Sequence, residues 1–232
     1  MKYFLFVLVL AVSVSMANQP SATGRVAGGT SSHGSDAEVV LWSQLPTGGL
    51  MGSQNFTDFS NYDAGVADDF EFLTSTTVNK IRWWGGYFNG SGTVPVDSLV
   101  EIYLYHDDGT GNAPTLPQHT SAFASWMVPP GSYTEVADGT NYKCEYVFPV
   151  LITFNPNMKY WIEIRKAFAF NPLGQYGWIR STPISLSPCV QGFDGMGVIW
   201  WTAQTTDAAF ELIFDDAVPL ERSTWADIKT IF

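Results

Sequence analysis

Large aromatic rings and charged groups alternate along three stretches of this sequence, in a pattern suited to binding a sugar. The residues concerned are Trp84, Tyr103, Tyr105, Trp161, Arg82, Glu101 and Glu163. Aromatic rings stack on the C–H faces of sugars, while carboxylate and guanidinium groups hydrogen-bond to sugar hydroxyls. If the strands that carry these residues are neighbours, the side chains form one aromatic, charged sheet face. We therefore expect a glycan to bind there.

The chain itself could instead cover this face. A loop, an N-terminal arm or a C-terminal helix would then bury the rings, and Arg82 would pair with Glu101 or Glu163 across the strands. The same two glutamates could be the carboxylate pair of a glycosidase. An acidic sheet offers such a pair by chance, however, and the sequence has no serine-hydrolase elbow, phosphate-binding loop or histidine-rich metal signature. We expect a binding protein and not an enzyme.

Aspartates form a second group with possible chemistry, because carboxylate oxygens are the ligands that calcium prefers. The candidates are Asp68, Asp107 and Asp108. Asp68 shares the alternation of Val66 and Phe70, so it should point into the core, where a carboxylate needs a partner. That partner could be calcium, Arg82 or backbone N–H groups. Asp107 and Asp108 lie in a glycine-rich loop without EF-hand spacing, so we expect no cofactor other than a structural calcium ion.

Short runs of alternating or β-branched residues must position these groups, since they recur from Glu38 onward between turn-forming clusters. They predict an all-β fold, a two-sheet antiparallel β-sandwich of jelly-roll type, because ten strands are too many for one open sheet. The predicted strands are 39–42, 64–73, 77–87, 98–106, 120–128, 142–150, 159–166, 176–181, 197–203 and 208–214. Alternation places Trp83 in the core and Trp84 on the outside.

The two ends of the chain differ from this pattern. Lys2 precedes an apolar stretch and small residues, which is typical of a signal peptide and indicates a secreted or cell-surface protein. Near the other end, Trp225, Ile228 and Ile231 are spaced for a short amphipathic helix. The predicted organisation is a signal peptide (1–17), a flexible arm (18–37), the β-sandwich (38–215) and a C-terminal tail with the helix (216–232).

The charge of the chain limits its partners. Acidic residues outnumber basic ones by 22 to 11, and the formal net charge is −11, which disfavours nucleic acid and anionic lipid. Beyond the signal peptide no segment approaches the roughly 20 apolar residues of a membrane span. We therefore expect a glycan or a cell-surface protein as the partner, with no nucleic acid and no membrane span.

Two cysteines, Cys144 and Cys189, are present in a chain predicted to reach an oxidising compartment. We expect them to form a disulfide, and two separate buried thiols are the alternative. The three histidines are scattered and show no zinc-ligand spacing with these cysteines.

The sequence also contains several distinctive motifs, namely Ala67-Asp68-Asp69-Phe70, the run from Val78 to Phe88 with Trp83-Trp84-Gly85-Gly86-Tyr87, Ile102-Tyr103, Tyr160-Trp161-Ile162-Glu163-Ile164, Gly177-Trp178, and Asp207 to Leu212. With these motifs the chain resembles a family of bacterial secreted β-sandwich domains. The resemblance covers roughly residues 39–214 in the order of that family. It implies a jelly-roll-like fold and an extracellular setting, and it implies no catalytic residue.

Overall fold

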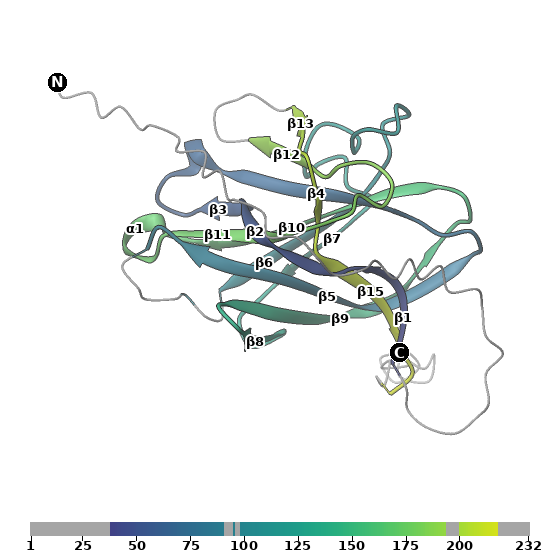
Figure 1. Cartoon of the computed structure of the whole chain (residues 1–232), viewed down its shortest axis with the longest axis horizontal. Coiled ribbons are helices and arrows are strands. Elements are labelled where there is room, and N and C mark those ends of the chain that lie inside the picture. Colours follow the sequence, from purple (N-terminus) through teal and green to yellow (C-terminus); the bar gives the residue numbers. More distant parts are fainter. Residues whose placement is uncertain (1–37, 91–94, 96–97, 194–199, 218–232) are drawn as a thin grey trace, which may run out of the picture. The chain divides into compact units, whose positions relative to one another are not determined.

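The structure, a computed structural model, describes residues 38–90, 95, 98–193 and 200–217 (Figure 1). Its strands form two sheets with a shared core between them, so the expected all-β, two-sheet sandwich is confirmed. The signal peptide and arm predicted at 1–37, and the helix predicted in the tail, lie outside the described residues.

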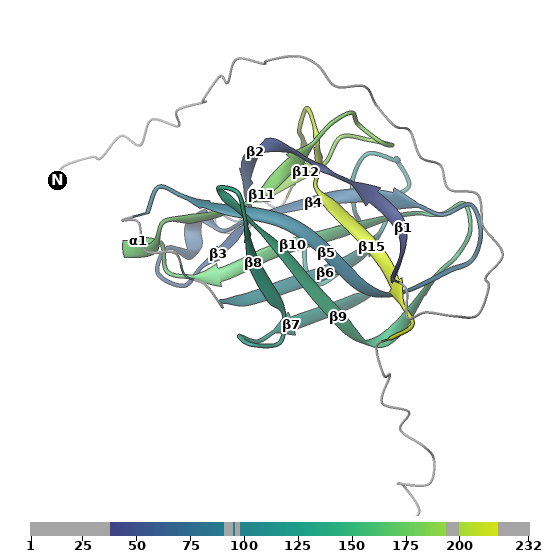
Figure 2. The same ribbon diagram turned by 60° about the horizontal axis from the view of Figure 1, so that its bottom comes forward.

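Sheet 1 has eight strands, whose main path runs β1-β15-β5-β11-β14. Strand β2 also pairs with β11, β9 pairs with β5, and β8 pairs with β9. The bounds are β1 (Glu38–Gln44), β2 (Pro46–Gly52), β5 (Thr76–Phe88), β8 (Thr134–Asp138), β9 (Asn141–Phe154), β11 (Gln175–Ser181), β14 (Asp207–Ala208) and β15 (Phe210–Asp215). Figure 2 shows β1 beside β15 at the margin of this sheet.

Sheet 2 has seven strands in the order β13-β12-β4-β3-β10-β6-β7. The bounds are β3 (Gln54–Phe56), β4 (Ala64–Glu71), β6 (Leu99–His106), β7 (Ala124–Val128), β10 (Lys159–Phe168), β12 (Val190–Phe193) and β13 (Trp201–Ala203). Strand β3 runs parallel to β10, whereas the other described pairings are antiparallel. A 3-10 turn, η1 (Ser60–Tyr62), and a single helical turn, α1 (Phe170–Leu173), lie in the connections.

The core between the sheets follows the predicted alternation. Ile102 on β6 and Ile164 on β10 point inward from sheet 2, and they meet Ile81 and Trp83 from β5 of sheet 1. Trp83 is fully buried, and its indole N–H donates to the Tyr176 hydroxyl at 3.0 Å. Period-2 alternation therefore identified the inward side chains correctly.

Four strands were absent from the sequence prediction, namely β2, β3, β8 and β12. Two of them show why. Strand β2 contains Gly48 and Gly49, both with positive φ, and such residues indicate a turn when the sequence is read alone. Strand β8 is largely exposed, so it carries little apolar pattern. Weak local signals of this kind become strands only through long-range pairing.

Candidate functional site

The aromatic residues predicted to form one face lie on two different sheets. Tyr103 and Tyr105 on β6 and Trp161 on β10 share the outer face of sheet 2, as alternation predicts. Trp84 lies on β5 of sheet 1, where it packs with Ile179. The prediction that all four rings share a surface is wrong, because strand order, which local alternation does not encode, places β5 away from β6 and β10.

These rings are buried by the chain itself, and none of the four is more than 7% exposed. On sheet 2 the indole N–H of Trp161 donates to Asp107 at 3.0 Å, and Trp201 packs edge-on against Tyr105. On sheet 1 the indole N–H of Trp84 donates to Asp138 at 3.1 Å. The open aromatic platform expected from the sequence is therefore absent at these four residues.

Glu163 lies fully buried on the outer face of sheet 2 and is surrounded by donors. Tyr105 and Gln118 donate to its two oxygens at 2.6 and 2.9 Å, and His119 Nε2 lies 3.2 Å away. Burial alone would raise the pKa of Glu163, but His119, the charge of Arg165 and the Tyr105 hydroxyl hold it below the usual range. A Cβ on Gly65 would lie 1.8 Å from the carboxylate, so this position requires glycine.

Glu101 belongs to a separate ion pair on the same face. It pairs with Arg165, accepts the Asn55 amide at 2.8 Å, and accepts the Tyr103 hydroxyl at 3.2 Å. The Arg165 guanidinium carbon also lies 5.8 Å from the centre of the Tyr103 ring. Both candidate glycosidase carboxylates are thus engaged by neighbouring side chains.

Arg82 pairs with neither of these glutamates. It lies on sheet 1 and forms ion pairs with Glu38, Glu145 and Glu211 at 2.5 to 2.6 Å. Glu145 and Glu211 lie on the strands that flank β5, and Glu38 lies one strand further on β1, so Arg82 is a cross-strand structural group. The predicted pairing of Arg82 with Glu101 or Glu163 is therefore wrong.

The aspartates proposed as calcium ligands do not lie together. Asp107 accepts the N–H groups of Gly109 and Gly111, while Asp108 accepts the N–H and hydroxyl of Thr110, so both act as turn formers. Asp68 points inward, as predicted, and accepts backbone N–H groups from its neighbour and from Ala208. Among the described residues no group of three or more histidine, cysteine or acidic side chains is arranged to hold a metal ion.

Both cysteines are free and buried, so the predicted disulfide is wrong. Cys144 lies on β9 of sheet 1, opposite Trp83. Cys189 directly precedes β12 of sheet 2, with its sulfur 3.4 Å from the sulfur of Met51. The two thiols have different neighbours, so each cysteine fills a separate buried position. The even number of cysteines therefore does not indicate a disulfide here.

We expect neither thiol to react with a maleimide in the native protein. Burial raises the pKa of Cys144 to about 12 and also raises that of Cys189, and the reactive species is the thiolate. After denaturation without reductant, mass spectrometry should show both cysteines labelled. If denatured, unreduced protein remains unlabelled, the disulfide exists after all.

A buried lysine is the main polar feature that sequence reasoning missed. Lys166 shares the inward alternation of Ile164, and its ammonium lies 2.7 Å from Glu135. The same ammonium donates to the hydroxyls of Tyr87 and Tyr133 at 2.7 and 3.1 Å. The alternation of the strand 159–166 already contained this signal, because it placed a lysine on the apolar side.

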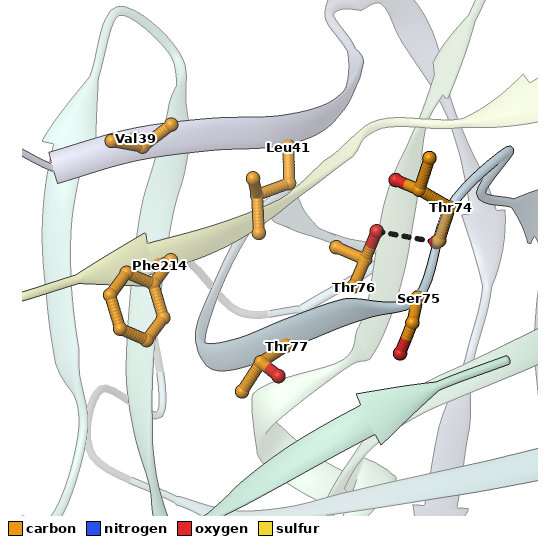
Figure 3. Close-up of a pocket in the computed structure, with 7 residues that line it drawn as sticks. All are labelled: Val39, Leu41, Thr74, Ser75, Thr76, Thr77 and Phe214. Atoms are coloured by element: carbon orange, nitrogen blue, oxygen red, sulfur yellow. Dashed lines mark hydrogen bonds between the residues drawn. The ribbon is translucent and has the colours of Figure 1, made fainter. Parts of the chain in front are cut away.

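One shallow groove lies at the open margin of sheet 1. Val39 and Leu41 of β1 and Phe214 of β15 form its apolar part, and residues 74–77 form a hydroxyl-rich part (Figure 3). Its volume is about 400 Å³, and the Thr76 hydroxyl donates to the Thr74 carbonyl at 2.9 Å. Aliphatic, aromatic and hydroxyl residues of this kind are ordinary in strands and turns, so no local signal in the sequence could have identified the groove.

Comparison with known proteins identifies a family. A family model described as a domain of unknown function, DUF7901, matches residues 40–213, and the chain belongs to this family. No curated protein and no solved structure matches the chain. In the described part of the chain, no helix combines the length and apolar character that crossing a membrane requires.

Proposed function

We propose that this DUF7901 protein is a secreted or cell-surface binding module without catalytic activity, which holds an extended segment of a partner protein along strand β1. The observation that carries this proposal is the open edge of β1 beside the groove of Val39, Leu41 and Phe214. An exposed edge strand binds extended peptides through its backbone groups, while neighbouring pockets select side chains.

The outer edge of β1 has no strand partner within the ranges that the structure describes. Among the described residues β1 pairs only with β15, so its other side offers backbone N–H and C=O groups. Val39 is 48% exposed and Val40 is 37% exposed, so the side chains of both are accessible to a partner strand. A register shift between Val40 and Trp42 interrupts the ladder with β15 and bends the strand.

The surroundings of the groove define the chemistry of the partner. Glu38 and Asp215 flank the edge, and together with Glu145 and Glu211 they outnumber the cations Lys80 and Arg82, with which they pair, by four to two. Asp216 adds a further negative charge. The whole chain carries a formal net charge of −11. A partner strand with alternating apolar and basic side chains would complement both the apolar part of the groove and its acidic rim.

Protein binding accounts for the structure better than the glycan hypothesis does. The rings meant to stack on sugars are buried under the chain's own residues, as the alternative derived from the sequence required. Glu101 and Glu163 are engaged by Arg165, Tyr105 and other neighbours, so neither carboxylate faces a cleft as glycosidase chemistry would demand.

Selection from a random peptide display library tests this proposal. We expect the protein to enrich peptides with alternating β-branched and basic residues, because these pair with an acidic edge strand. Val39→Lys should weaken the selected peptides at least about tenfold, since it adds a positive charge and removes an apolar wall. Titration by fluorescence anisotropy measures the change.

Val136→Lys provides the matched control. Val136 is also an exposed valine on a margin strand, β8, but it lies away from the groove. Selected peptides should bind this variant as they bind the unsubstituted protein. Equal loss in both variants, or binding to a glycan array in place of the peptides, would overturn the proposal.

A further inference from the structure

Aromatic rings gather at the surface where β3 and β10 end. The two strands run parallel, and Phe56 of β3 lies opposite Phe168 of β10. The residues that follow both strands therefore emerge at the same end of sheet 2. Turn η1 comes soon after β3 and helix α1 comes soon after β10, and Figure 1 shows α1 and β3 at one end of the sandwich.

Hydrogen bonds and ring contacts hold these two connections together. The Asp58 carboxylate accepts the backbone N–H groups of Phe170 and Asn171 at 2.7 and 3.1 Å. The Phe170 ring packs edge-on against Phe56 and Phe59, whose ring centres lie 6.0 and 6.1 Å from its own. Phe56 is only 4% exposed, so these contacts anchor the surface rings in the interior. The rings are thus positioned before any ligand binds, which lowers the entropic cost of binding.

Phe59 and Tyr62 present much of their rings to solvent. Phe59 is 48% exposed and Tyr62 is 61% exposed. The Tyr62 N–H donates to the Phe59 carbonyl at 2.9 Å, which closes the 3-10 turn. Such a turn repeats every third residue, so Phe59 and Tyr62 lie on the same side of η1. We call the surface formed by Phe59, Tyr62 and Phe170 the η1 surface.

The residues around these rings distinguish a sugar from a protein as the ligand. Thr57, Asp58, Ser60 and Asn61 are all exposed and polar. Aspartate and serine are depleted from the centres of protein interfaces, since a protein partner would remove water from them without supplying enough hydrogen bonds. A sugar offers C–H groups to the rings and hydroxyls to the carboxylate, amide and hydroxyl groups. The mixture of rings and small polar groups therefore favours a sugar.

The charge of this surface limits the class of sugar. Residues 54–64 contain two aspartates and no basic residue, and the chain has a formal net charge of −11. Uronic acids and sialic acids would be repelled by this charge. A neutral glycan meets no such repulsion.

We propose that the η1 surface binds a neutral glycan, whose pyranose rings stack on Phe59 and Tyr62 while Asp58 and Asn61 hydrogen-bond to its hydroxyls. The site is separate from the four buried rings predicted from the sequence. It is also separate from the groove at β1, because the two lie at opposite ends of β4. Tyr62 precedes β4, whereas Thr74 of the groove follows it, and the 8 residues of this strand span roughly 26 Å. Glycan and peptide binding can therefore be measured independently.

A glycan array tests the proposal. We expect the protein to bind neutral oligosaccharides and to leave glycans with uronic or sialic acids unbound. Tyr62→Ala should weaken the neutral oligosaccharide that binds best by at least about tenfold, because it removes the most exposed ring. Tyr62→Trp should retain binding, since it keeps a ring for stacking. Isothermal titration calorimetry measures these affinities, and the melting temperature of Tyr62→Ala should change by no more than about 2 °C.

Phe123→Ala is the matched control. Phe123 is 41% exposed, and its ring packs on His106, which lies opposite Tyr160 near the start of β10 and so at the other end of sheet 2. This variant should bind the oligosaccharide as the unsubstituted protein does. Val39→Lys should also bind it normally, so a failure of the peptide proposal would not affect this result.

Three results would overturn the glycan site. The first is an array on which the protein binds no neutral glycan. The second is an unchanged affinity in Tyr62→Ala, or an equal loss in Tyr62→Ala and Phe123→Ala. The third is weaker binding of the selected peptides by Tyr62→Ala without any glycan binding, which would make the η1 surface a protein contact.

Discussion

Trp161→Ala should lower the free energy of unfolding by about 3–5 kcal/mol, which is the usual cost of truncating a large buried ring. Trp161 is fully buried and packs with Tyr105 and Ala67 in the second apolar cluster, on the outer face of sheet 2. Its loss would leave a cavity there and would also leave Asp107 without an indole donor. Denaturant unfolding followed by fluorescence measures the change.

Trp200→Ala is the matched control. Trp200 is 58% exposed and directly precedes Trp201, which packs against Tyr105 on the outer face of sheet 2. Its substitution should change the free energy of unfolding by no more than about 0.5 kcal/mol. If Trp161→Ala unfolds at the same denaturant concentration as the unsubstituted protein, the outer face of sheet 2 is open in solution. The aromatic rings on this face would then be exposed, as the glycan hypothesis requires.

Local alternation was sufficient to predict which side chains face the core. Tyr103 and Trp161 point outward while Ile102 and Ile162 point inward, as the sequence indicates. This success has a simple cause, because successive side chains on a strand point to opposite faces whatever its neighbours are. The all-β class followed from the same periodicity and from the turn residues between strands.

The order of strands could not be predicted in this way. Trp84 and Trp161 have equivalent local patterns, but β5 and β10 belong to different sheets. Pairing depends on contacts between residues far apart in the chain, and alternation carries no information about them. The four predicted rings therefore lie on two different sheets, although alternation gave the correct orientation of each ring within its own strand.

Irregular segments cover the outer face of sheet 2, and such segments show no hydrophobic periodicity in the sequence. Gln118 and His119 lie outside any strand and still reach Glu163. His119 adopts a positive φ of 63°, a conformation that tertiary contacts impose on a residue other than glycine. The edge position of β1 escaped prediction for a related reason, since it depends on which of the described strands pair and not on the local sequence.

The buried surroundings of Lys166 lead to a prediction about the stability of the fold. Its ammonium is enclosed by the rings of Tyr87, Tyr133 and Tyr176, whose centres lie 5.1 to 5.3 Å away. Glu135 of β8, in sheet 1, supplies the counter-charge to this lysine of sheet 2. The Tyr87 hydroxyl in turn donates to Glu135 at 2.8 Å, and burial next to that carboxylate raises the pKa of Tyr87.

Lys166→Met should therefore lower the free energy of unfolding by about 3–5 kcal/mol, because it removes the ammonium that pairs with the buried carboxylate of Glu135. The double variant Lys166→Met with Glu135→Leu should recover much of this loss, since apolar groups of similar size often replace a buried ion pair without cost. Lys143→Met is the control: Lys143 is partly exposed and lies 3.7 Å from Glu145, so its substitution should cost no more than about 1 kcal/mol. Urea unfolding of the three variants measures these differences. A double variant as unstable as Lys166→Met alone would show that the lysine acts through its contacts with the tyrosine rings and not through the charge of Glu135.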